Sequence, residues 1–425
     1  MKHSNPDGPK RTSNSYNKDV IDATERGVTI NGVKGKCNLS HLKHYNPVSS
    51  TCIDYMHSIL EGVVKNFFKF WFSSEYRISE NFSLRKFIHI IDHKLLLIKP
   101  PSFVPNAPRS LGTWKQWRAH EFLAFILYYA IPVFNNIMSP EYHRNILKLV
   151  IFIEILLSKA VNINHLKISQ KLIVEFINEL NSLYPECIML SGVHELLHFV
   201  ECTLDFGPLN MTNLFTYEEL NRIIVRSIKG KDLIGEEFIK LFSTAQRLSK
   251  IEPTTEVVKE FLKKTPILRT SNRNNHEKSS IRIKLLSTQY LSRDLKYLNV
   301  FNEFTKKKLD EIYCIDRLQY KSHVYETLNE KKKFCDSCFV SSSGVFGVIE
   351  TFLFDNVNVY VVGRKVINIF NYNWENNTLN SNLQICHITD ELFLTKLEEI
   401  CKCVLIFISD TECYISKFSI SHLFT

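Results

Sequence analysis

The sequence predicts an α+β protein, in which a mostly helical region is followed by a small antiparallel β domain. Between about residues 50 and 250, apolar residues recur at the three- and four-residue spacing of helices. After about residue 318, the chain changes to runs rich in β-branched and aromatic residues, separated by Gly, Asp and Asn. We therefore expect a helical region over residues 36–315 and a β domain over residues 318–425.

The N-terminal part of the chain is polar. It begins MKHSNPDGPKRTSNSYNKD and lacks the apolar core of a secretory signal. We expect residues 1–35 to form a flexible lead and the protein to be intracellular. The eleven cysteines should then be free thiols or metal ligands rather than disulfides.

Three apolar stretches predict the helices of the core. One is DYMHSILEGVVKNFFKFWF (54–72), whose apolar residues line one helix face. The others are FLAFILYYAIPVF (122–134) and LKLVIFIEILL (147–157). Both are shorter than the roughly 20 residues that cross a bilayer, so we interpret them as buried helices and expect no membrane partner. The proline-rich stretch KPPSFVPNAPRS (99–110) predicts a loop between helices.

A further helix is expected over residues 216–231, TYEELNRIIVRSIKGK. Thr216 can cap its start, Glu219 can complete a capping box, and Gly230 suits its end. This arrangement leaves Glu218 free for another role.

The β domain is predicted from four runs: GVFGVIETFLF, VNVYVVGRKVINIFNY, KCVLIFIS and CYISKFS. Runs of this length, joined by turn residues, fit an antiparallel barrel or sandwich of roughly a hundred residues. Small domains of this kind often bind other molecules on their surface, so we consider a protein partner here.

The formal net charge of +9 favours a polyanionic partner. Basic residues cluster at 229–232, 262–278, 304–310 and 329–334. Each cluster taken alone is interpreted as a solvated loop. Four clusters within about a hundred residues favour a nucleic-acid partner, and we expect DNA.

The stretch SGVHELLHFVE (191–201) contains His-Glu-x-x-His. His194 and His198 could hold zinc, and Glu195 could activate a bound water, as in metallopeptidases. Glu218 lies twenty residues past His198, near the distance of a third ligand. However, a motif this short arises by chance in a chain with fifteen histidines, and DFGPLNMTNLF before Glu218 is not the usual setting of that ligand.

Two other groups are weaker candidates. Cys335 and Cys338 form one C-x-x-C, and a second metal-binding pair would have to come from ICH (385–387) or CKC (401–403). Because CKC begins an apolar run, we expect buried thiols. Asp54 and His57 stand three residues apart at the start of a helix, where they could share a cleft or act as a cap and a satisfied histidine.

Three blocks of the sequence resemble one family when they are taken in order. They are GVKGKCNLSHLKHYNPVSSTCIDYMHSILEGVVKNFFKFWF (32–72), WKQWRAHEFLAFILYYAIPVF (114–134) and LYPECIMLSGVHELLHFVECTLDFGPLNMTNLFTYEELN (183–221). Each resembles a block of the CACTA (En/Spm) class of transposases and their animal relatives. The resemblance covers roughly residues 30–230.

The resemblance implies a fold and a set of site residues. The family is expected to have an RNase H-like core split by a helical insertion, where three acidic residues hold two divalent metals such as magnesium. Glu218 would be the last of the three, and Asp54 and His57 would be the Asp-x-x-His motif that precedes it. Two histidines recur in the family before Gly-Pro-Leu, so His194 and His198 need bind no zinc.

The chain departs from the family pattern at its start. The first two catalytic aspartates of relatives precede the GVKG segment, but here about thirty residues precede it, and Asp19 and Asp22 have no strand around them. We therefore expect an incomplete core in a truncated, transposase-derived, nuclear protein that associates with nucleic acid and does not cleave it. Magnesium would bind only if the site were completed. The alternatives are a protein-interaction or chromatin-associated module and, least favoured, a zinc metallopeptidase.

Overall fold

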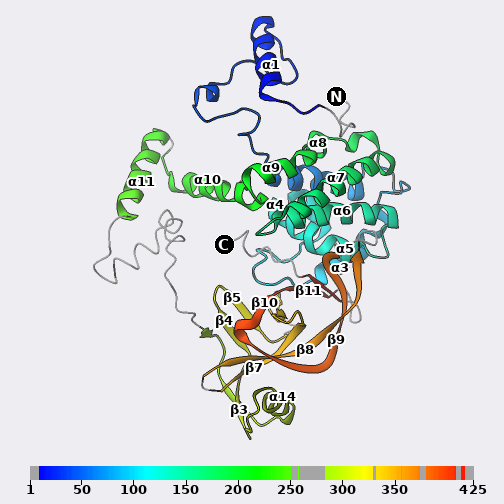
Figure 1. The fold of residues 1–425 in the computed structure, drawn as a ribbon, viewed down its shortest axis with the longest axis vertical. Coiled ribbons are helices and arrows are strands. Elements are labelled where there is room, and N and C mark those ends of the chain that lie inside the picture. The colour runs from blue at the N-terminus through cyan, green and yellow to red at the C-terminus, as the bar shows by residue number, and fades with distance from the viewer. Residues whose placement is uncertain are drawn as a thin grey trace. The chain divides into compact units, whose positions relative to one another are not determined.

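The fold is α+β, as the sequence predicts (Figure 1). The computed structural model describes residues 9–230, 232–249, 257, 283–328, 332–355, 357–373, 380–407 and 413–416. The chain forms two compact units. One comprises Met1–Thr212 together with Ile283–Thr425, and the other is Asn213–Arg282.

The first part of the larger unit is helical. Its elements are α1 (Ser13–Arg26), η1 (Asn38–His41), the π-helix η2 (Met56–Val64), α2 (Lys65–Phe72), η3 (Arg85–Phe87), α3 (Ile88–Leu97), η4 (Leu111–Gln116), α4 (Ala119–Ala124), the π-helix η5 (Phe125–Tyr129), α5 (Ala130–Phe134), α6 (Pro140–Leu157), α7 (Ile163–Leu183), η6 (Glu186–Ile188), α8 (Ser191–Glu195), η7 (Leu196–His198), α9 (Phe199–Phe206) and η8 (Leu209–Thr212). Helix α1 lies within the lead expected to be flexible. Thr12 caps it, because its hydroxyl accepts the backbone N–H of Ser15 at 3.1 Å.

Aromatic side chains form the centre of the helical core. Phe68 packs edge-on against Phe122 and Phe125, with ring centroids 5.1 and 4.8 Å apart. Trp71 is fully buried, and its indole N–H donates to the Tyr184 hydroxyl at 3.0 Å. The two apolar stretches predicted as buried helices are confirmed, since they form α4 to α5 and most of α6 with buried side chains. In the part of the chain that the structure describes, no helix combines the length and apolarity needed to span a membrane.

The rest of the larger unit is mainly antiparallel sheet. Its elements are β1 (Ile283–Leu285), β2 (Tyr290–Ser292), α14 (Leu295–Thr305), β3 (Ile312–Ile315), β4 (Arg317–Tyr320), β5 (His323–Glu326), β6 (Cys338–Ser341), β7 (Phe346–Phe354), β8 (Val359–Asn373), β9 (Asn380–Lys396), η10 (Leu397–Glu399), β10 (Ile400–Lys402), β11 (Val404–Phe407) and β12 (Cys413–Ser416). The larger sheet runs in the order β10-β6-β7-β8-β9-β12-β11, with β3 pairing with both β7 and β2. A smaller sheet has the order β1-β4-β5.

The sheet begins earlier than the sequence predicts. Tyr313 in β3 pairs with Phe354 in β7, so the boundary expected near residue 315 falls inside the β region. Contacts also join this region to the helices. The N–H of Cys335 donates to the carbonyl of Pro100 at 3.0 Å, and the Asn135 amide donates to the Tyr414 hydroxyl at 3.0 Å. Both regions belong to the larger compact unit.

The smaller unit contains α10 (Phe215–Ser227) and α11 (Ile234–Ser249). A helix was predicted here, but its caps were predicted wrongly. Leu214 occupies the N-cap position and makes no side-chain cap, while Glu219 forms an ion pair with Arg222. The helix ends before Gly230, whose N–H donates to Glu237 at 2.9 Å.

Candidate functional site

Asp54 and His57 lie together at the start of η2, as their spacing predicts. The Asp54 carboxylate accepts the backbone N–H of His57 at 2.9 Å and contacts its Nδ1 at 2.7 Å. The His57 side chain is about half exposed, at 52%. The carboxylate therefore caps the helix start and also fixes the orientation of the imidazole.

The phenol of Tyr55, the residue that follows Asp54 in the chain, is buried. Burial, with a smaller contribution from the charge of Asp54, raises the pKa of Tyr55 well above its usual range. Tyr55 therefore stays neutral at physiological pH.

Glu195 turns toward η2 and is already hydrogen-bonded. It accepts the Ser58 hydroxyl at 2.5 Å, across 137 positions of sequence. Gly192 permits this close approach, since a Cβ there would lie 3.1 Å from the carbonyl oxygen of Ser58. The carboxylate that a peptidase would use as its base therefore connects α8 to η2.

His194 and His198 face one another beside an open hollow. Their Nε2 atoms are 3.3 Å apart, and Nδ1 of His198 lies 3.7 Å from a Glu201 oxygen. The hollow has a volume of about 690 Å³. It is also lined by residues from the N-terminal segment and from α7: Pro9, Lys10, Arg11, Ser15, Asp19, Asn31 and Gln170.

No family model, curated protein or solved structure matches the chain. The site must therefore be judged on its own geometry. Lys10 pairs with Glu201, and Arg11 lies 3.8 Å from Asp19, so the cations of the hollow have acidic neighbours. Among the described residues, no group of three or more His, Cys, Asp or Glu side chains is placed to hold a metal ion. The expectation of no zinc at His194 and His198 remains a prediction.

Glu218 lies in the smaller unit, in the first turn of α10, and is exposed. Its backbone N–H donates to the carbonyl of Leu214 at 2.9 Å. Asp54 and His57 belong to the larger unit. The catalytic role that the sequence resemblance implies for Glu218 remains a prediction.

Cys335 and Cys338 are buried, as predicted, and the expectation that they bind no metal remains a prediction. Burial raises the pKa of both. Sγ of Cys335 lies 3.0 Å from the Ser337 hydroxyl, while Sγ of Cys338 lies 3.0 Å from Sγ of Cys403. The two halves of the C-x-x-C thus have different neighbours.

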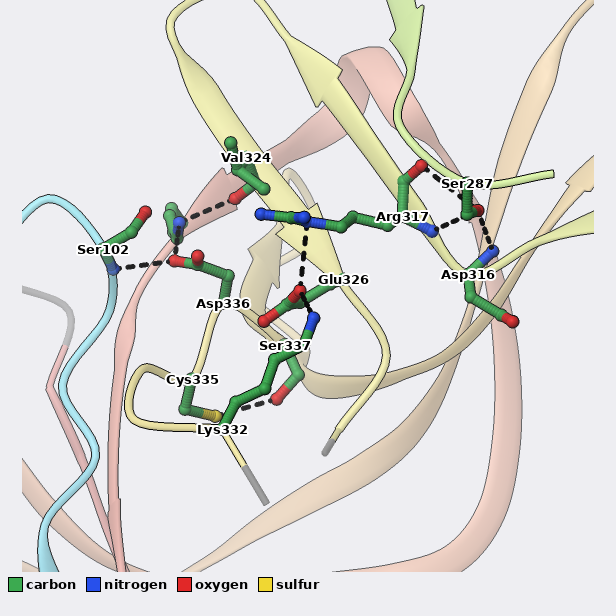
Figure 2. Close-up of polar contacts among 11 residues, drawn as sticks. Ser102, Ser287, Asp316, Arg317, Val324, Glu326, Lys332, Cys335, Asp336 and Ser337 are labelled. Carbon is green, nitrogen blue, oxygen red and sulfur yellow. Dashed lines mark hydrogen bonds and ion pairs between the residues drawn. The ribbon is translucent and has the colours of Figure 1, made fainter. Parts of the chain in front are cut away.

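A buried ion pair was missed by sequence reasoning. Lys402 pairs with Asp336, and their side chains are 2% and 4% exposed. The ammonium also donates to the carbonyl of Val324 at 2.7 Å, and Asp336 accepts the backbone N–H of Ser102 at 2.9 Å (Figure 2). Burial lowers the pKa of Lys402, opposed by the charge of Asp336. The signal was a lone lysine at the start of the apolar run KCVLIFIS.

The predicted basic clusters are partly neutralised. Lys307 pairs with Asp355 at 3.0 Å. Lys332 pairs with Glu326, which also accepts Arg317 at 3.2 Å (Figure 2). The cluster at 262–278, residue 231 and residues 329–331 lie outside the described residues. Charge counting along the sequence therefore overestimates the cationic surface of the β region.

Proposed function

We propose that this chain is a transposase-derived protein that associates with DNA and does not cleave it. Its helical region would correspond to part of an RNase H-like core with a helical insertion, and its β region to a small barrel or sandwich. The observation that carries the proposal is the mutual packing of the three blocks that resemble CACTA-class transposases.

The first block contacts the second through aromatic rings. Phe68 belongs to block 32–72, and its ring lies 5.9 Å from that of Trp114 in block 114–134. The first block also contacts the third. Trp71 donates to Tyr184, and Ser58 donates to Glu195, both in block 183–221. Contact between segments this far apart in sequence supports their interpretation as one inherited module.

The lack of cleavage is supported by the available carboxylates. Two-metal phosphoryl transfer needs several carboxylate oxygens to hold both ions. The resemblance carries over Glu218 alone as a metal ligand, and Asp54 already accepts two contacts from His57. Within described residues 9–230, the β structure is one isolated bridge, Ile30 with Val33, rather than the strands that would bear further aspartates. These donors do not fit a two-magnesium centre.

A DNA partner implies a nuclear location, which is part of the same proposal. The experiment is a binding titration of the full chain against labelled duplex DNA at several salt concentrations. Each phosphate contact releases counterions, so the affinity should fall steeply as salt rises. Plasmid nicking with magnesium or manganese is measured in parallel. Absent or salt-independent binding contradicts the DNA association, and metal-dependent nicking contradicts the lack of cleavage.

A further inference from the structure

Residues 26–53 of the helical region carry charged side chains of one sign only. They contain Arg26, Lys34, Lys36 and Lys43, and no Asp or Glu. All four cationic side chains belong to exposed residues. In the part of the chain that the structure describes, none of the four is in an ion pair. The positive charge here is therefore available to an external anion.

The segment is held in place at both ends by helix α1. The Asn31 amide donates to Asp19 at 3.0 Å, and the Asn46 amide donates to the Ser13 hydroxyl at 2.9 Å. Around the first of these anchors, Ile30 and Val33 exchange backbone hydrogen bonds of 2.9 and 2.8 Å. Gly32, with φ of +83°, allows the tight turn that this bridge requires. A segment ordered before binding loses less conformational entropy when a ligand arrives.

We propose that residues 26–53, which we call the basic segment, form the main DNA phosphate-contacting surface of this protein. This inference rests on the proposed DNA association and names the surface that carries it. Four unneutralised cations match the dense line of phosphates on a duplex. The segment also exposes Leu39 and Leu42, at 49% and 57%, beside His41. Such apolar and imidazole groups can pack against sugars while the lysines reach phosphates.

The β-region clusters, which the sequence favoured for this role, are less suited to it. Lys307 and Lys332 each have a carboxylate partner that a phosphate would have to displace. An external anion gains little from a cation that is already paired. Among the described residues, no carboxylate is paired with the cations of the basic segment, so a phosphate would not have to displace one.

The test compares two variants that each remove three positive charges. The first is Lys34→Gln/Lys36→Gln/Lys43→Gln in the basic segment. The matched control is Lys306→Gln/Lys308→Gln/Lys333→Gln, which changes three exposed lysines of the β region. All six side chains are exposed, so circular dichroism and the thermal midpoint should match those of the wild type.

The basic-segment variant should bind duplex DNA on the order of tenfold or more weakly, with a salt slope smaller by up to about three. The control should stay within about threefold of the wild type, because its lysines are outside the contact surface. If the control loses as much affinity as the basic-segment variant, the inference is wrong and the DNA association stands. If the wild type itself does not bind DNA, the proposed function fails first, and the two failures are thereby distinguished.

Discussion

The rings of Phe339 and Phe393 meet with their centroids 5.7 Å apart, above two glycines of the large sheet. Phe339 in β6 is the register partner of Gly347 in β7, and Phe393 in β9 is the partner of Gly363 in β8. The two central strands thus lack side chains where the two flanking strands provide large ones. The rings fill the space above the backbone of the glycines and join four strands into one packed layer.

Gly363→Ala should destabilise the protein by about 1–3 kcal/mol, because a Cβ there would lie 2.8 Å from the ring of Phe339. Phe339 is completely buried and has little space to move. Chemical denaturation measures the change in the free energy of unfolding. Gly235→Ala is the control, since no atom lies within 4 Å of its added Cβ. Equal stability of both variants would contradict this account of the sheet.

Lys402→Met should cost about 3–5 kcal/mol, because it leaves Asp336 buried without its cation. The double variant Lys402→Met/Asp336→Leu should be less destabilised than the single one, since it removes both charges together. Denaturation of the two single variants and the double variant gives the coupling energy. Additive effects would mean that the pair does not interact energetically.

Acid should destabilise the protein through His143. Burial lowers the pKa of His143, although its hydrogen bond to the carbonyl of Ile131 opposes the shift. Below the unfolded pKa of about 6.5, the unfolded chain gains a proton that the folded chain does not, so stability falls as pH decreases. His143→Gln should reduce the slope of unfolding free energy between about pH 7 and 5. An unchanged slope would contradict this; His120 and His323, whose pKa values burial also lowers, should keep the remaining slope.

The purified chain should contain no stoichiometric zinc at His194 and His198, because Glu195 is engaged by Ser58 and both histidines fit the transposase-like block. Elemental analysis after dialysis measures the metal content. His198→Ala provides the comparison. One zinc per wild-type chain that disappears in this variant would revive the peptidase alternative.

Glu218→Gln should leave DNA affinity unchanged or slightly higher, because it removes a negative charge and, under the proposed function, no cleavage reaction depends on that charge. Neither protein should nick a plasmid with magnesium or manganese. The measurement is a parallel binding titration and nicking assay. Metal-dependent nicking by the wild type that the substitution abolishes would show an active site built around Glu218.

The helices over 122–134 and 147–157 could be predicted because these stretches are apolar almost throughout, which is the pattern of a short helix buried on all its faces. The first three strands, β1 to β3, could not be predicted. Strands β1 to β3 have three or four residues each, too few for a period-two pattern to appear. Their pairing depends on partners such as β7, which lies far along the chain.

In the candidate site, too, some contacts could be predicted from the sequence and others could not. The contact of Asp54 with His57 follows from helical spacing and could be predicted. The contact of Ser58 with Glu195 and that of Lys402 with Asp336 join segments 137 and 66 positions apart. The local sequence around a residue does not determine which carboxylate from a distant segment of the same chain will contact it. For this reason, the sequence could show Glu195 as a candidate peptidase base but gave no sign of its contact with Ser58.

The contact between Ser102 and Asp336 has a consequence for synthesis of the chain. The two residues are separated by 234 positions, and a ribosome adds roughly 5–20 residues per second. The loop around Ser102 therefore leaves the ribosome roughly 10–50 seconds before its partner exists. During that interval the nascent helices present an uncovered surface that includes Asn135, whose partner Tyr414 is synthesised later still. We expect chaperone dependence during translation to end when the last strands emerge.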